Sequence, residues 1–176
     1  MNPLWLLIDT ACPRAMVALA KEGKVLSEKY LDDYRQHGEC LAGAIDSCLT
    51  GAKVSQKDLG AIAVGVGPGS FIGVRIAIAH AKGLGAALSI PVIGFNTLAG
   101  IESHAAAFVA LDARRSEFYV WKVGSLEESQ LLGEMPESTY LEKNGPAVNK
   151  VVELLPVGIP LREDKLRPVY LRDAGC

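Results

Sequence analysis

Hydrophobic residues recur along the chain in short runs and in helical stripes, and the two patterns alternate. Apolar runs at 4–8, 16–20 and 25–30 predict three strands that open the chain as an antiparallel set. A helical stripe occupies 39–49, and the apolar run at 61–66 predicts a further buried strand. This order of elements predicts an α/β fold.

A glycine-rich turn at 65–75 separates that strand from the rest of the chain. The elements expected after it are a helix at 70–88, a strand at 91–94, a short helix capped by Asn96 or Thr97, and a hairpin with strands at 106–111 and 118–123. The hairpin belongs to a second sheet. Beyond it, prolines and glycines divide the chain into short, loop-rich pieces.

The turn Gly67-Pro68-Gly69-Ser70 joins a strand to a helix, and Ser70 is placed to cap that helix. Free N–H groups at a helix N-terminus can hold an anion, which makes the turn a weak candidate for a nucleotide site. The pattern lacks the Gly-Lys-Ser/Thr of a P-loop and the spacing of a dinucleotide fingerprint. A tight structural turn, in which the glycines permit close backbone approach, explains the same residues.

The helix at 70–88 is apolar on more than one side. One stripe carries Val74, Ile78, Ala81, Gly85 and Leu88, and a second carries Ile72, Ile76, Ala79 and Gly83. One stripe suffices to cover a sheet, so the second is expected to pack against another helix or another chain. Packing by the helix at 39–49 within the same chain is the alternative.

Few polar residues suggest chemistry. Asp9 ends the first buried strand and could coordinate a metal ion or position a water. Hydrogen bonding of Asp9 and Thr10 within their own turn is the favoured interpretation, since both residue types do this readily. His37 precedes a helix and is expected to be a cap or a surface residue. The four cysteines form no C-x-x-C pair, which indicates free thiols and neither a zinc nor a redox motif.

Composition narrows the classes of function that the chain can have. The chain of 176 residues has a net charge of −2, so no general attraction to nucleic acid is expected, and any RNA contact must be local or made through a partner. No run reaches the length of a membrane span, and the N-terminal residues lack the basic region of a signal peptide. We expect a cytoplasmic protein without membrane contact.

Several motifs occur in an order that resembles the bacterial TsaB (YeaZ) family. They are Leu7-Ile8-Asp9-Thr10, His37-Gly38-Glu39, the stretch from Gly67 to Ile76, Ala81-Lys82-Gly83-Leu84, the stretch from Leu111 to Tyr119, and the stretch from Pro168 to Arg172. The resemblance implies the actin, Hsp70 and sugar-kinase (ASKHA) architecture of two ribonuclease H-like subdomains. We expect residues 1–104 to form the first subdomain and residues 105–176 an abbreviated second one.

The resemblance also implies a function. In this family the protein is a non-catalytic relative of the threonylcarbamoyl transferase TsaD, and it acts as a scaffold or activator for that enzyme. The complex makes threonylcarbamoyladenosine at position 37 of tRNAs reading codons that begin with A. A TsaE-type ATPase assists it. The resemblance implies no tightly bound cofactor for the chain alone, and ATP or ADP with Mg²⁺ only in the partner complex. It also implies that the chain contacts tRNA only through that complex.

The family's pairing surface implies specific residues. It lies on the helices that correspond to 39–49 and 70–88, so we expect a homodimer of the chain alone and a heterodimer with the transferase. The side chains expected at this interface are Leu41, Ile45, Leu49, Val74, Ile78, Ala81 and Gly85. Family-motif residues without an assigned role are Asp9, His37, Arg75, Asp112, Arg114 and Glu117. No catalytic or metal-ligating residue is expected.

Two departures from the family favour the structural interpretation of the glycine turn. Ile72 stands where the family usually has Thr, and Pro13 in the first turn lacks an N–H that could bind phosphate. An ATP-dependent small-molecule kinase remains the alternative function, supported by Asp9 and the glycine turn. A glycoprotease-like peptidase is a weaker one, because His37, His80 and His104 suggest no catalytic set.

Overall fold

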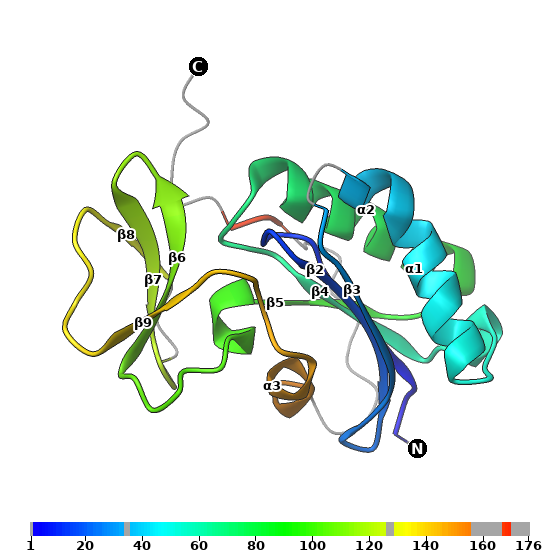
Figure 1. Cartoon of the computed structure of the whole chain (residues 1–176). Helices are drawn as coiled ribbons and strands as arrows, with labels where there is room; N and C mark the ends of the chain where they lie inside the picture. The colour runs from blue at the N-terminus through cyan, green and yellow to red at the C-terminus, as the bar shows by residue number, and fades with distance from the viewer. Residues whose placement is uncertain (1, 34–35, 126–128, 156–166, 170–176) are drawn as a thin grey trace.

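The computed structural model describes residues 2–33, 36–125, 129–155 and 167–169. Its larger part is a five-stranded mixed sheet in the order β3-β2-β1-β4-β5 (Figure 1). The strands are β1 (Trp5–Asp9), β2 (Ala15–Lys21), β3 (Lys24–Leu31), β4 (Ala61–Gly65) and β5 (Val92–Phe95). Strand β2 is antiparallel to β1 and β3, whereas β1, β4 and β5 are parallel. Central strands β1 and β4 are buried throughout, which accounts for their uninterrupted apolar sequence.

Two helices cover one face of this sheet (Figure 1). Helix α1 (His37–Gly51) and helix α2 (Phe71–Leu88) pack on β1, β2 and β4, and the core between them includes Leu6, Ile62 and Val64. By length and composition α2 could span a membrane. Core helices of soluble proteins pass the same test, and α2 packs one stripe on the sheet.

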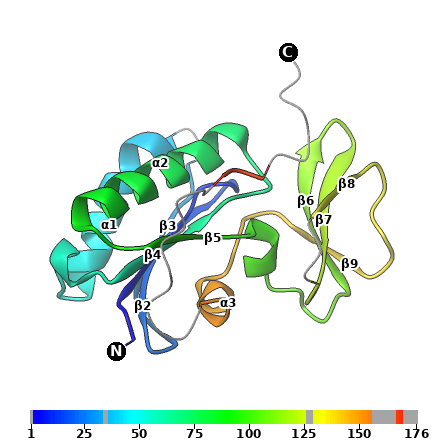
Figure 2. The same cartoon turned by 180° about the vertical axis from the view of Figure 1, so that it is seen from behind.

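Helix α3 (Val148–Glu153) covers the opposite face of the sheet (Figures 1 and 2). Its buried residues Val148, Val151 and Val152 pack with Trp5 and Leu7 of β1. Side chains of a strand alternate between the two faces, so β1 contributes Leu6 and Ile8 to one core cluster and Trp5 and Leu7 to the other. The sheet is therefore covered on both sides.

The second part of the molecule is a four-stranded sheet in the order β8-β7-β6-β9. Its strands are β6 (Phe108–Arg114), β7 (Glu117–Lys122), β8 (Gln130–Leu132) and β9 (Thr139–Glu142). The short helix η3 (Thr97–Gly100) lies between the two sheets, and its Leu98 packs with Val109 and Leu111 of β6. A second short helix, η2 (Gln56–Asp58), precedes β4.

The structure contains the elements that the sequence predicts as far as β7. Helix α1 is longer than the predicted 39–49, and β6 continues through residues expected in a turn, to Arg114. Three short elements, β8, β9 and α3, were not predicted. The two strands are three and four residues long without a clear alternation, and α3, although its valines have helical spacing, is only six residues long and lies among prolines and glycines. The second half does contain a helix after Gly145, but it packs on the first sheet and forms no layer over the second.

Candidate functional site

The glycine turn connects β4 to α2 at the carboxyl ends of the parallel strands. Gly67 has a φ of +95°, in the region that favours glycine. Ser70 caps α2, since its Oγ accepts a hydrogen bond from the Gly73 N–H at 3.1 Å. The predicted cap is therefore confirmed.

The amides of this turn donate within the protein. The Gly67 N–H donates to Thr97 Oγ1 at 3.2 Å, and the Ser70 N–H donates to the Ala11 carbonyl at 2.7 Å. Together with the Gly73 N–H, these are three of the amides near the helix N-terminus at which an anion could bind. The arrangement favours a structural turn over a phosphate cradle, because a bound phosphate would have to displace these internal acceptors.

The glycines also permit close packing against the first turn of the chain. A Cβ at Gly69 would lie 2.5 Å from the Ala11 carbonyl oxygen, and one at Gly65 would overlap the Asp9 carboxylate. A Cβ at Gly73 would overlap the Thr10 carbonyl oxygen. The spacing of the glycines therefore follows from contact between two turns of the same chain.

Asp9 lies at the centre of this contact and is 1% exposed. Its Oδ1 accepts the Ala11 N–H at 2.7 Å, and its Oδ2 accepts the Thr97 hydroxyl at 2.8 Å. Burial raises the pKa of Asp9 from 3.8 to about 6, and the two hydrogen bonds oppose that rise. Since the carboxylate is enclosed and both oxygens accept hydrogen bonds from the protein, its geometry fits the turn-stabilising interpretation better than a metal or substrate contact.

His37 was predicted to be a cap or a surface residue, and this prediction is wrong. The side chain is 1% exposed, and its Nε2 lies 3.1 Å from the Leu31 carbonyl oxygen. The residue is the first of α1, and its imidazole contacts the last residue of β3. The sequence around His37 is polar, and it gave no signal that the side chain turns inward.

The structure also corrects the side chains chosen for the partner interface. The seven residues all lie in the core of the single chain, where they pack between the helices and the sheet: Leu41, Ile45, Leu49, Val74, Ile78, Ala81 and Gly85. Both apolar stripes of α2 were recognised, but the stripe that faces the sheet was assigned to the partner. A Cβ at Gly85 would overlap Val92 of β5, which identifies the side of α2 that faces inward.

The solvent face of α1 and α2 carries a different set of residues. Ile72 is 67% exposed and Phe71 is 37% exposed. Gly43 and Gly83 are exposed as well, and an added Cβ would meet no atom within 4 Å at either position. We name this surface the outer helix face, and define it by Ala42, Gly43, Phe71, Ile72, Ala79 and Gly83.

The remaining family-motif residues lie at two places. Arg75 is on the exposed side of α2, with its guanidinium carbon 3.7 Å from the centre of the Phe71 ring. Asp112, Arg114 and Glu117 lie at the tip of the β6–β7 hairpin, on the second sheet. The motif residues do not form one constellation. Tyr170 and Arg172 of the closing motif are outside the described residues, but the Val169 N–H donates to the Val66 carbonyl beside the glycine turn at 2.7 Å.

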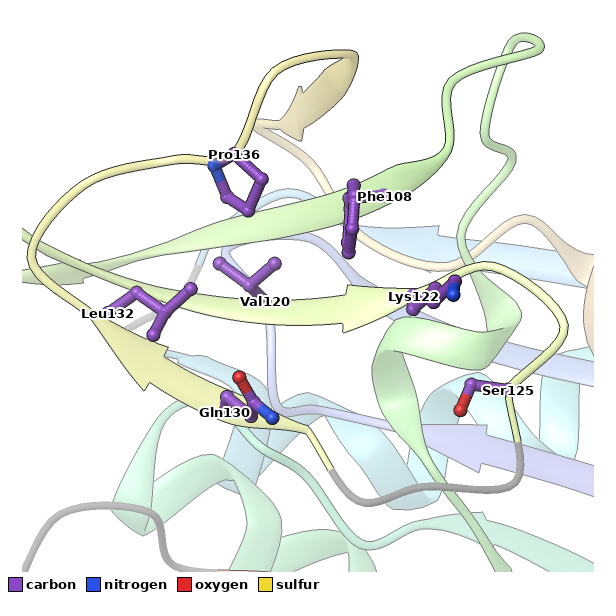
Figure 3. A pocket seen from close by; sticks show the side chains of 7 residues that line it. All are labelled: Phe108, Val120, Lys122, Ser125, Gln130, Leu132 and Pro136. Atoms are coloured by element: carbon purple, nitrogen blue, oxygen red, sulfur yellow. The ribbon is translucent and has the colours of Figure 1, made fainter.

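A pocket of about 100 Å³ opens on the second sheet (Figure 3). It is lined by Phe108, Val120, Lys122, Ser125, Gln130, Leu132 and Pro136. None of the predicted site residues is among them. Within the described ranges, no group of three or more His, Cys, Asp or Glu residues is arranged to hold a metal ion.

Comparisons with known proteins give consistent results. The family model TsaD, described as tRNA N6-adenosine threonylcarbamoyltransferase, matches residues 24–162. The chain is 37% identical over 121 residues to tRNA threonylcarbamoyladenosine biosynthesis protein TsaB of Escherichia coli (strain K12), covering 65% of this chain and 52% of the relative. It is 33% identical over 132 residues to the protein of the same name in Bacillus subtilis (strain 168), covering 70% of this chain and 58% of the relative.

One solved structure matches almost throughout. It is the crystal structure of an uncharacterized protein with similarity to peptidase YeaZ from Pseudomonas aeruginosa, with a TM-score of 0.78 and 25% identity. The match covers 97% of this chain and 100% of that one. The chain spans little more than half the length of the curated relatives it matches.

Proposed function

The chain belongs to the TsaB (YeaZ) family, within the wider family of tRNA N6-adenosine threonylcarbamoyltransferases, and on that premise we propose that it is a non-catalytic scaffold or activator of a TsaD-type transferase. The pair takes part in the formation of threonylcarbamoyladenosine at position 37 of tRNAs that read codons beginning with A. The proposed setting is the cytoplasm, where the chain forms a homodimer when alone.

The main support for the proposed pairing comes from two glycines on the outer helix face. Nothing in the described part of the single chain requires glycine at these two positions. Gly43 and Gly83 lie inside helices, and an added Cβ would meet open space at both. Glycine inside a helix is less stable than alanine by about 0.5–1 kcal/mol. These positions therefore lower the stability of the monomer, and they permit another chain to approach α1 and α2 closely.

The neighbouring side chains suit such an approach. Ile72 and Phe71 expose apolar surface at the start of α2, and Arg75 stacks on the Phe71 ring. Exposed apolar surface of this kind, rimmed by polar groups, is typical of protein–protein interfaces. A helix pair that presents small residues between larger apolar ones can accept the ridges of a second helix pair.

The polar turns support the non-catalytic part of the proposal. A kinase or transferase of this architecture binds phosphate through turn amides, and in this chain the Gly67, Ser70 and Gly73 N–H groups donate to internal acceptors. Asp9 is too enclosed to act on a substrate. The peptidase alternative would need an activated nucleophile, for which Cys40 is the candidate thiol. Its Sγ lies 3.7 Å from Gln36 Oε1, an acceptor that cannot take up a proton to activate a thiol.

The architecture fits the same family. A sheet in the order β3-β2-β1-β4-β5, with only β2 reversed, supports a ribonuclease H-like first subdomain of the ASKHA type. The division into 1–104 and 105–176 stays a proposal. Helix α3 is an exception to it, since this helix follows the second sheet in sequence and packs on the first.

Light scattering on the purified chain mixed with its cognate transferase tests the pairing. We expect a heterodimer with the wild-type chain and none with Gly83→Arg, because the arginine would occupy the approach between the two chains. Gly133→Arg is the matched control, since Gly133 is also exposed with open space around it but lies on the second subdomain. Heterodimer formation by the Gly83→Arg variant, with affinity equal to that of Gly133→Arg, would contradict the proposed surface.

A further inference from the structure

The tip of the β6–β7 hairpin has an uncommon backbone. Arg114, Arg115 and Ser116 have φ values of 65°, 56° and 59°, in the left-handed region that non-glycine residues rarely adopt. Arg114 pairs with Glu117 across the strands, which leaves Arg115 and Ser116 as a two-residue loop. Loops with both central residues at positive φ favour Asn-Gly, so this chain holds Arg-Ser where another pair would fit with less strain.

Strained backbone conformations often occur at functional sites, and the packing of this fold does not explain the strain at the hairpin tip. Arg114, Arg115 and Ser116 are all exposed, so none of them fills the core. The strands below the tip are fixed by apolar contacts, since Leu111 and Tyr119 pack with Leu98 and Ile101 next to the first sheet. A rigid base therefore presents two adjacent arginines to solvent.

The charged groups at the tip leave the guanidinium of Arg115 exposed to solvent. Asp112 uses Oδ1 to accept the backbone N–H of Arg114 at 2.7 Å, which stabilises the turn. Glu117 stands opposite Arg114 in the register of the two strands, which places a negative side chain beside that arginine. Arg115 makes no hydrogen bond or ion pair with any residue that the structure describes, and its five N–H donors form a planar fork that matches the oxygens of a phosphate group.

We propose that this hairpin tip contacts the phosphate backbone of the tRNA, with Arg115 as the main contact and Arg114 beside it. The inference rests on the proposed function, because the RNA is held by the complex with the transferase. The net charge of −2 gives the chain no general attraction to nucleic acid, so its contribution has to come from a local cation. Contacts to phosphate position an RNA without reading its sequence, which suits a subunit that serves several tRNAs.

The position of the hairpin is compatible with this role. Figures 1 and 2 place its tip at the end of the second sheet that lies on the same side of the molecule as the α1–α2 layer. The proposed partner docks on the outer helix face of that layer. An RNA bound across the complex can therefore reach the hairpin from the partner's side.

The test measures binding of an unmodified tRNA transcript to the complex of the full chain with its transferase, at several salt concentrations. Arg115→Glu is compared with Lys57→Glu, an exposed lysine of η2 whose replacement changes the net charge equally. We expect Arg115→Glu to weaken tRNA binding on the order of tenfold and to reduce the slope of log K against log salt by about 0.7–0.9. Lys57→Glu should change neither quantity.

Two further measurements separate the possible failures. Ser116→Gly relieves strain without changing charge, and we expect its Tm to rise by about 2–4 °C with tRNA affinity unchanged. The proposal would be overturned if the Arg115→Glu complex bound tRNA with wild-type affinity and wild-type salt slope. It would also be overturned if this variant no longer bound the transferase, because the tip would then be a contact between proteins. Failure of the wild-type chain to bind the transferase at all would instead contradict the proposed function.

Discussion

Replacement of Asp9 by Asn is the most informative test of the contact between the first turn and the glycine turn. The carboxylate is 1% exposed, and its pKa is raised from 3.8 to about 6 because burial disfavours the charged form. A folded-state pKa above the unfolded value means that the folded state binds the proton more tightly. The stability that this group contributes is therefore fully present below pH 3.8, decreases as pH rises to about 6, and is lost above that.

The magnitude follows from the two pKa values. A difference from 3.8 to about 6, at about 1.4 kcal/mol per pH unit, corresponds to about 3 kcal/mol of instability at neutral pH. Asn removes the charge and keeps an oxygen that can accept the Ala11 N–H. Its amide group cannot accept the Thr97 hydroxyl, however, and the loss of that hydrogen bond costs about 1 kcal/mol. The expected net gain at pH 7 is about 2 kcal/mol.

Urea unfolding of the wild type and of Asp9→Asn, followed by far-UV circular dichroism between pH 4 and pH 8, measures this difference. Other groups titrate equally in both proteins, so the difference between the two free energies of unfolding isolates Asp9. It should move by about 2.4 kcal/mol in favour of Asn as pH rises from 4 to 7, because a small part of the titration lies outside this range. A difference that stays constant over this range, or an Asn variant that is less stable at pH 7, would refute the reasoning.

Four further substitutions have definite expected outcomes in thermal or denaturant unfolding. Gly73→Ala should destabilise the fold by about 2–4 kcal/mol, because its Cβ would overlap the Thr10 carbonyl oxygen; a Tm near wild type would contradict the packing. Gly43→Ala should stabilise the monomer by about 0.5–1 kcal/mol, and no gain would mean that the helix already needs the glycine. Thr97→Val should cost about 2–3 kcal/mol, since it leaves the Gly67 N–H without its acceptor and Asp9 without a donor; unchanged stability would show that the hydrogen bonds are not needed. Val74→Glu should leave no folded chain detectable by circular dichroism, because Val74 is 1% exposed in the core, and a folded monomer would show that α2 is rotated.

Much of the first sheet was predictable from periodicity, because its strands and helices each have a strong and different pattern. Strands β1 and β4 are continuous apolar runs, and the capping Ser70 sits directly before an apolar helix. The short strands β8 and β9 could not be predicted in this way. Their burial is intermediate at nearly every position, so the alternation that marks a half-buried strand is absent from the sequence.

The residues of the site were harder to predict than the elements. Helix α2 has two apolar stripes, and the sequence alone does not say which one meets the sheet; the overlap between a Cβ at Gly85 and Val92 decides it. The network of Asp9 with Thr97 joins residues 88 positions apart, which no local pattern can reveal. Burial of His37 depends in the same way on the path of β3, and its outcome was the opposite of the prediction.

The rate of threonylcarbamoyladenosine formation by the purified cognate transferase, measured with and without this chain, tests the central claim most directly. All other components of the modification reaction are held constant, and the product is quantified in a tRNA that reads codons beginning with A. The account predicts that the rate rises with added chain until the two proteins are equimolar and then stays constant. An equal rate in the absence of the chain would contradict it.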